Sequence, residues 1–476
     1  MSGNSQTWSA VVQSFENIWG YTQFRYPQGE IIGAILDGQD TVVVMPTGGG
    51  KSICFQLPAL LQEGLTLVIS PLVALMENQV GELLEKNLPA ARLHSELSKA
   101  ERSATLGQID SRTLRLLYLS PETLLSPVIW EKLRQPQVKI NGLILDEAHC
   151  LVQWGDNFRP AYRRLGAVRP ALLQYKPEGT KIAIAAFTAT ANPDAQKIMV
   201  DVLKLENPRS FLVNPYRDNL HIKARICLSP YCRRKNLLKV VKSHPIESGL
   251  VYVRSRKESQ YISGWLESHN YRTKPYHAGL SPSDRRYLEK QWLENNLQFI
   301  VCTSAFGMGI NKPDVRWVIH YQAPLYLCDY LQEIGRGGRD GKETEVVTLM
   351  SEPTGWIDKS DRQKENFFRA QSRQQYQQAS HMARLIPGEG TVEDISKAYP
   401  GGAIVLSLLH SYNSLEWLDP FRYRLTSKKV KNRIGDKEMS NYLYARGCRW
   451  AYLLSAFGFK TNTGWRCGHC DNCGRR

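Results

Sequence analysis

Residues 41–52 read TVVVMPTGGGKS, an apolar β-branched run that leads into a glycine-rich loop. The run is typical of a buried strand, and the loop is typical of a turn that enters a helix. Backbone amides of such a loop converge on phosphate oxygens, while a lysine ammonium and a serine hydroxyl can hold a terminal phosphate and Mg²⁺. The alternative is a glycine-rich turn without a ligand, because Met45 or Pro46 stands where the full motif has its first glycine. The residues predicted to bind nucleotide are Thr47, Gly48, Gly49, Gly50, Lys51 and Ser52.

Two adjacent carboxylates, Asp146 and Glu147, follow the apolar run 143–145. Ligands of parallel α/β sheets bind beyond the carboxyl ends of the strands, so we expect this pair at the same edge as the glycine-rich loop. Asp146 can hold Mg²⁺ while Glu147 polarises the attacking water, as phosphoryl transfer requires. A pair of helix-capping carboxylates is the alternative, and the phosphate loop upstream speaks against it.

A third motif, at residues 332–341, reads QEIGRGGRDG. We expect Arg336 and Arg339 to share one helical face and to reach a γ-phosphate when two lobes close. Gln332 belongs to the same predicted catalytic set. The alternative is an exposed, salt-bridged helix start, which the glycines oppose. If the two arginines reach the γ-phosphate, hydrolysis depends on closure of the two lobes.

Apolar runs that are typical of parallel strands form two series, divided near residues 209–219. The first series is 41–45, 65–70, 114–120, 140–145 and 181–187, and the second is 248–253, 298–303, 316–320 and 345–350. We therefore predict an α/β fold of two lobes, 1–212 and 213–352. A helical connector with an insert (353–440) and a small C-terminal module (441–476) would follow.

The chain carries 61 basic and 45 acidic side chains, a net charge of +16, and 42% of its residues are hydrophobic. This composition is that of a folded globular protein. Residues 421–476 hold thirteen Lys/Arg against three Asp/Glu, which points to a polyanionic partner, nucleic acid first and a membrane surface second. A surface charge that serves only solubility is the alternative. No apolar run reaches the ~18 residues of a membrane helix, and the N-terminus lacks a signal or transit pattern. We expect a cytosolic monomer without a membrane partner, associated with the chromosome, or nuclear in a eukaryote.

Four further segments complete a pattern that resembles the RecQ family of DNA helicases, superfamily-two motors with two RecA-like lobes. They are WGYTQFRYPQ at 19–28, SPLVALM at 70–76, FTATA at 187–191 and TSAFGMGI at 303–310. The resemblance covers roughly residues 15–350 and the C-terminal module. It implies that Arg25 and Gln28 contact adenine, although Trp19 replaces the usual Phe. It also implies ATP-driven 3′ to 5′ unwinding of duplex DNA, with Mg²⁺ and a structural Zn²⁺.

The segment 153–160, QWGDNFRP, is similar to the aromatic-rich loop of that family. Trp154 and Phe158 offer stacking faces for single-stranded bases, and Arg159 can reach phosphate. Packing of the two rings in the core is the alternative. Asp156-Asn157 replaces the His-Asp that the family generally has, so we expect strand-dependent ATP hydrolysis to be weaker or differently coupled.

Four cysteines close the chain: Cys448, Cys467, Cys470 and Cys473. Their thiolates fit a tetrahedral structural Zn²⁺, which so small a module needs in order to fold. An iron–sulfur cluster also suits this spacing, and unliganded thiols are the third possibility. Cys448-Arg449 and the run 470–473 resemble the RecQ zinc module.

Residues 391–426 show the pattern of short helices followed by a two-stranded wing. We predict either a small winged helix or an all-helical insert that only packs. The family carries its winged helix after the zinc module, followed by a distal helical domain, and residues for neither remain, so we expect a short form. Basic residues around Arg422 and Arg424, continuing into 428–433, are expected to face duplex DNA.

The leading function is that of an ATP-dependent DNA helicase acting on single-stranded, forked or duplex DNA in repair, recombination or replication. One alternative is an RNA-unwinding DEAD/DEAH ATPase, which the aromatic loop and the cysteines oppose. A DNA-binding scaffold with a decayed ATPase is the other. The intact Lys51, Glu147, Arg336 and Arg339 speak against it.

Overall fold

The structure is a computed structural model and describes residues 8–152, 159–306, 310–427 and 438–474. The chain divides into two units. The first comprises Met1–Met45, Gly49–Val213 and Ser372–Arg433, and the second comprises Asn214–Gln371 and Ile434–Arg476, with Pro46–Gly48 grouped with it.

The first unit is built on a seven-stranded parallel sheet in the order β3-β4-β2-β5-β6-β1-β7. Its strands are β1 (Thr41–Val44), β2 (Leu65–Ile69), β3 (Ala90–Leu93), β4 (Leu116–Leu119), β5 (Ile140–Leu145), β6 (Ala183–Thr188) and β7 (Arg209–Leu212). The helices are α1 (Trp8–Trp19), α2 (Gln28–Leu36), α3 (Lys51–Leu61), α4 (Val73–Glu85), α5 (Lys99–Asp110), α6 (Pro121–Leu124), α7 (Pro127–Leu133), α8 (Val168–Leu173) and α9 (Pro193–Leu203), with 3₁₀ helices η1 (Ala148–Leu151) and η2 (Pro160–Ala167).

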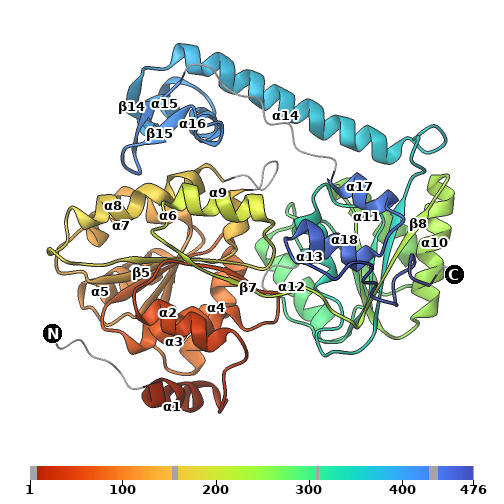
Figure 1. Cartoon of the computed structure of the whole chain (residues 1–476), viewed down its shortest axis with the longest axis horizontal. Coiled ribbons are helices and arrows are strands. Elements are labelled where there is room, and N and C mark those ends of the chain that lie inside the picture. Colours follow the sequence, from red (N-terminus) through yellow and green to blue (C-terminus); the bar gives the residue numbers. More distant parts are fainter. Residues whose placement is uncertain (1–7, 153–158, 307–309, 428–437, 475–476) are drawn as a thin grey trace. The chain divides into compact units, whose positions relative to one another are not determined.

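Both faces of this sheet are buried, which explains the continuous apolar runs of its strands. Side chains alternate along β1, so that Val42 and Val44 enter one core cluster and Val43 enters another. Helices α2, α3 and α4 cover the face of Val43, and α6 to α9 cover the opposite face (Figure 1).

The second unit has a six-stranded parallel sheet in the order β10-β11-β9-β12-β13-β8. Its strands are β8 (Leu220–Ile226), β9 (Ser248–Tyr252), β10 (Thr273–Tyr276), β11 (Phe299–Cys302), β12 (Val315–His320) and β13 (Thr344–Met350). Its helices are α10 (Pro230–Ser243), α11 (Arg256–Glu267), α12 (Pro282–Leu293) and α13 (Leu327–Ile334). Helix α14 (Ser360–Leu385) continues from this unit into the first.

The predicted two-lobed α/β fold is confirmed, and each predicted strand has its counterpart in the sheets. The sequence patterns missed β3, β7, β8 and β10. These strands lie at sheet edges, where one side of the strand has no neighbour and the apolar signal is weak. In β8, for example, buried residues alternate with partly exposed ones.

The insert after α14 has the arrangement of a winged helix. Strand β14 (Glu389–Thr391) precedes α15 (Val392–Ala398) and α16 (Gly402–Ser411), and β15 (Leu415–Trp417) and β16 (Arg422–Leu425) follow. The three strands form an antiparallel sheet in the order β14-β16-β15. The all-helical alternative is therefore wrong.

The C-terminal module, with α17 (Glu438–Tyr444) and α18 (Arg449–Ala456), covers the edge strand β8. The backbone N–H of Asp471 donates to Ile222 O (3.0 Å), and its carboxylate accepts from the N–H of Ala224 (3.0 Å). An uncovered edge strand would offer unpaired backbone groups to other chains, so this contact protects the sheet.

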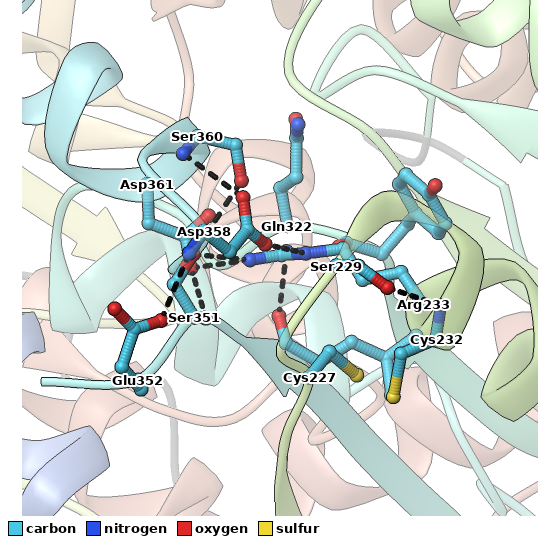
Figure 2. A network of polar contacts seen from close by, with 12 residues as sticks. Cys227, Ser229, Cys232, Arg233, Gln322, Ser351, Glu352, Asp358, Ser360 and Asp361 are labelled. Atoms are coloured by element: carbon cyan, nitrogen blue, oxygen red, sulfur yellow. Dashed lines mark hydrogen bonds and ion pairs between the residues drawn. The ribbon is translucent and has the colours of Figure 1, made fainter. Parts of the chain in front are cut away.

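Arg233 joins the start of α10 to the start of α14 (Figure 2). Its side chain is 2% exposed and lies against the carboxylates of Asp358 and Asp361. The guanidinium donates to Asp358 Oδ2 (3.2 Å), Asp361 Oδ2 (2.7 Å), Ser351 Oγ (2.8 Å), Tyr321 O (2.9 Å) and Leu349 O (3.2 Å). A buried charge with this many partners fixes where α14 begins.

We expect Arg233→Met to lower the free energy of unfolding of the second unit by about 3 to 5 kcal/mol, because it leaves the buried Asp358 carboxylate without its cation. Denaturant unfolding of the full chain measures this change. Lys235→Met, on the exposed side of α10, is the matched control and should change stability little. Equal stability of the two variants would contradict the assigned role.

Candidate nucleotide site and metal centre

The glycine-rich loop connects β1 to α3, as predicted, and its backbone needs two of its glycines. Gly48 and Gly50 have φ values of 84° and 78°, in the left-handed region that favours glycine. A Cβ on Gly50 would also lie 2.3 Å from Gln28 Nε2. Lys51 begins α3, and its Nζ donates to Met45 O (3.1 Å), across the mouth of the loop. Thr47 and Ser52 are partly exposed beside it.

Gln28 contacts the glycine-rich loop. Its amide Nε2 donates to Gly49 O (3.3 Å) and Gly50 O (3.4 Å), while its Oε1 accepts from the N–H of Arg25 (2.9 Å). Gln28 is buried and Arg25 is exposed. The predicted adenine segment is thus tied to the loop through Gln28, a contact that the sequence did not indicate.

Asp146 lies at the end of β5 and is buried. Its carboxylate accepts from Gln79 Nε2 of α4 (3.2 Å) and from the N–H of Glu147 (3.0 Å). Burial and the neighbouring Glu147 raise the pKa of Asp146 to about 6, while Lys51 acts in the opposite direction. The site therefore favours a further positive charge beside Asp146, as a divalent cation would supply.

Glu147 has a φ of 51°, an uncommon value for a residue with a side chain. Its carboxylate lies 3.2 Å from His149 Nδ1, which also lies 3.1 Å from Thr188 Oγ1 at the end of β6. Burial opposes protonation of His149, but Cys150 and Glu147 raise its pKa above the ordinary value. These contacts join residues 146–149 to the FTATA segment at 187–191, two motifs that the sequence alone did not connect.

The prediction that Arg336 and Arg339 share a helical face is wrong. Helix α13 ends at Ile334, and both arginines follow it in a glycine-rich turn. Gly338 has a φ of 51°, and a Cβ there would lie 2.5 Å from Lys342 O, so the turn requires glycine. Gln332 remains on α13.

The turn still brings the two arginines together. Arg336 is buried, and Arg339 donates to Ile310 O (3.1 Å) and Asn311 Oδ1 (2.8 Å). Burial, Arg336 and Arg217 lower the pKa of Arg339 to about 10. Binding of an anion would reduce the electrostatic repulsion between these clustered cations.

Glu333, between the predicted catalytic residues, anchors α13. Its carboxylate accepts two hydrogen bonds from Arg254 (2.9 and 2.7 Å) and lies 3.0 Å from His320 Nε2. Burial opposes ionisation of Glu333, but the Arg254 guanidinium outweighs it and lowers the pKa to about 2. Sequence reasoning gave Glu333 no role. A glutamate on the apolar side of α13 is the signal that it overlooked.

Trp154 and Phe158 lie outside the described residues, as does the Asp156-Asn157 departure. Arg159 precedes η2, and its guanidinium lies 3.3 Å from Glu122 Oε2. Both side chains are partly exposed, so this ion pair contributes little stability.

The four terminal cysteines converge, with their sulfur atoms all within 4.8 Å of one another. A tetrahedral zinc site, with Zn–S near 2.3 Å, places sulfurs about 3.8 Å apart. Cys467 Sγ lies 3.8 Å and Cys470 Sγ lies 3.4 Å from Cys473 Sγ. Backbone N–H groups of Arg449 and Cys467 donate to Cys470 Sγ and Cys448 Sγ, as they would to thiolates. The four residues fit a tetrahedral metal ion.

Three family models match the chain. They are the DEAD/DEAH box helicase (residues 25–198), the helicase conserved C-terminal domain (232–341) and the RecQ zinc-binding model (426–474). A curated ATP-dependent DNA helicase RecQ of Synechocystis sp. is 51% identical over 473 residues, 98% of each chain. The probable ATP-dependent DNA helicase RecS of Bacillus subtilis is 38% identical over 71% of this chain and 66% of its own.

Solved structures of lower identity share the fold. The Mycobacterium smegmatis helicase Lhr, bound to ssDNA and AMP-PNP, has a TM-score of 0.58 at 19% identity, over 72% of this chain and 48% of its own. Mss116p, bound to ssRNA and AMP-PNP, has a TM-score of 0.59 at 16% identity, over 74% and 77%. At these identities the likeness concerns the fold alone. No helix in the described ranges has both the length and the apolar composition to cross a bilayer.

The lowered pKa of Glu333 predicts a loss of stability in acid. Because its pKa is lower in the folded state, Glu333 contributes stability above its ordinary pKa of 4.5, and this is lost as the pH falls toward 2. The difference corresponds to about 3 kcal/mol, at ~1.4 kcal/mol per pH unit. In denaturant unfolding, Glu333→Gln should be less stable than wild type at pH 7 and lose less on acidification.

Glu343→Gln is the matched control, since Glu343 is 87% exposed. It should follow the wild-type pH profile. If Glu333→Gln also follows that profile, the buried ion pair is not the cause.

Proposed function

Because the chain belongs to the RecQ family of ATP-dependent DNA helicases, we propose that it couples ATP hydrolysis to 3′ to 5′ unwinding of duplex or forked DNA. One observation carries the proposal. Strands β1 and β5 lie in the same parallel sheet, so the glycine-rich loop after β1 and the buried Asp146 at the end of β5 share its carboxyl edge, which supports one nucleotide site there. Roles in repair, recombination or replication follow from the family.

We assign different roles in hydrolysis to different residues of this site. We assign the backbone of 47–50 to the phosphates, Lys51 to the β- and γ-phosphates, and Ser52 and Asp146 to Mg²⁺. The metal neutralises charge on the phosphates when bound. Glu147, held beside His149, orients the attacking water and takes its proton. Arg25 and Gln28 would hold the adenine end, with Gln28 also supporting the loop.

We assign Gln332, Arg336 and Arg339 to the γ-phosphate as a second group of charges. The support is the clustering of Arg336 and Arg339 in the turn after α13 and the repulsion between them that an anion would reduce, with Gln332 on the helix that leads into this turn. Their action on nucleotide stays a prediction.

We assign single-stranded DNA to the aromatic-rich loop, with stacking on Trp154 and Phe158 and a phosphate contact by Arg159. Cys448, Cys467, Cys470 and Cys473 would hold a structural Zn²⁺, as the convergence of their thiols and the RecQ zinc-binding match support. A monomer working at the chromosome is the simplest form consistent with these assignments.

ATP hydrolysis should be stimulated by single-stranded DNA and much less by single-stranded RNA of the same sequence. Lys51→Ala and Glu147→Gln should each lower the stimulated turnover on the order of a hundredfold or more, since each removes a charge used at the phosphates. Steady-state ATPase assays with either strand measure both effects. Stronger stimulation by RNA would instead make the chain an RNA-dependent ATPase.

Lys86→Ala and Glu85→Gln are the matched controls, because both side chains are exposed at the end of α4. They should hydrolyse ATP at the wild-type rate. Near-normal turnover in the folded Lys51 or Glu147 variant would remove the assigned roles.

Elemental analysis of the purified chain should find about one zinc per molecule. Cys470→Ser should lose the metal and give insoluble or truncated protein, because metal binding is also folding free energy for this module. Cys328→Ser, outside the cluster, should retain the zinc. Brown colour with iron in place of zinc would mean an iron–sulfur cluster.

A further inference from the structure

Helix α16 occupies the place of the recognition helix in the winged-helix insert. In a DNA-binding helix-turn-helix, the second helix enters the major groove, and cations on and around it contact phosphates. The sequence of α16 is GAIVLSLLHS, which has neither Lys nor Arg. Val405, Leu406, Leu408 and Leu409 are buried, whereas Ile404 is exposed. This helix is built to contact protein.

The contact partner of α16 is η2 of the first lobe, within the same unit. Ser407 is 1% exposed, and its Oγ donates to Pro160 O at the start of η2 (3.0 Å). At the other end of η2, Ala167 joins the apolar cluster of the insert. The insert therefore holds η2 along its length.

A second contact lies at the turn before β16. The ring of Phe421 meets Trp130 of α7 edge to face, with ring centroids 5.2 Å apart. Arg164 of η2 donates to Pro420 O (3.2 Å), and burial lowers the pKa of Arg164 to about 10. Two separate points of attachment fix the orientation of the insert on this lobe.

On the solvent face of the small sheet, Arg424 is paired with a carboxylate, so it is not a free cation. Arg424 Nε lies 2.6 Å from Glu389 Oε1 on β14, and Glu416 stands opposite Arg424 on β15. Arg422 remains exposed, and the stretch 428–433 lies outside the described residues. The described face thus offers duplex DNA little net positive charge.

We propose that the winged-helix insert is an intramolecular brace for η2, which positions Arg159 for contact with single-stranded DNA. Arg159 immediately precedes Pro160, whose carbonyl accepts the Ser407 hydrogen bond. Holding this backbone in place before DNA arrives reduces the entropy lost on binding. Ser407 and Phe421 are positioning residues in this arrangement, and the inference rests on the proposed DNA-stimulated ATPase.

The test uses the full chain carrying Ser407→Ala or Phe421→Leu. Loss of one buried hydrogen bond, worth about 0.5 to 1.5 kcal/mol, corresponds to a rise of roughly twofold to tenfold in the single-stranded DNA concentration that gives half-maximal ATPase. Basal ATPase and the KM for ATP should not change. Hydrogen exchange of the backbone amides of 161–167 should become faster.

Ser411→Ala is the matched control. The Ser411 hydroxyl donates to Ser407 O within α16 (2.9 Å), so the same chemical change removes a hydrogen bond within the helix and none to η2. It should leave the half-maximal DNA concentration and the exchange of 161–167 at wild-type values. Phe421→Leu keeps apolar volume while removing the ring contact, and it serves if Ser407→Ala is poorly folded.

Three results would overturn the brace and leave the proposed function intact. Faster exchange of 161–167 with an unchanged half-maximal DNA concentration would make the contact one of packing alone. Unchanged exchange would show that the insert does not hold η2. Weaker duplex binding with unchanged stimulation by single strands would make the insert a duplex-binding module. A wild-type chain without DNA stimulation would contradict the proposed function itself, and the brace with it.

Discussion

The buried carboxylate of Asp146 is the constraint around which the first lobe is organised. Burial of a carboxylate raises its pKa unless positive charge and hydrogen bonds stabilise the ionised form. Lys51 and Gln79 supply part of this compensation from α3 and α4. Because the strands are parallel, their carboxyl ends meet at one edge of the sheet, and α3 and α4 can both reach Asp146 there.

The second lobe uses the same architecture with the signs of charge reversed. Here the cations Arg336 and Arg339 gather in a turn after α13, and Glu333 fixes that helix to Arg254. The buried acid therefore serves as a structural counter-charge to Arg254. The cysteine module covers the edge strand of this sheet, so one element both carries the cysteine cluster and protects β8.

The insert has a fold that is common in DNA-binding modules but uses it for a contact with protein. Its helices and strands have the winged-helix arrangement, yet the helix that would enter DNA lacks cations and packs on η2. Fold alone would have assigned it to duplex DNA, whereas its side chains assign it to protein. Helix α14 leads into it from Arg233, so both ends of this helix are fixed by buried contacts.

The sequence by itself determined the two α/β lobes, the phosphate loop, the Asp146–Glu147 pair and the cysteine cluster. Each is written in a short contiguous pattern, since strand burial, glycine turns and ligand spacing act over a few residues. Edge strands β3, β7, β8 and β10 were not predicted because their apolar signal is weak. Only the tertiary structure decided that α13 ends before Arg336, that Glu333 pairs with Arg254 79 residues away, and that Ser407 meets Pro160 across 247 residues. Such contacts depend on which surfaces the folded chain brings together, and no local pattern encodes the partner.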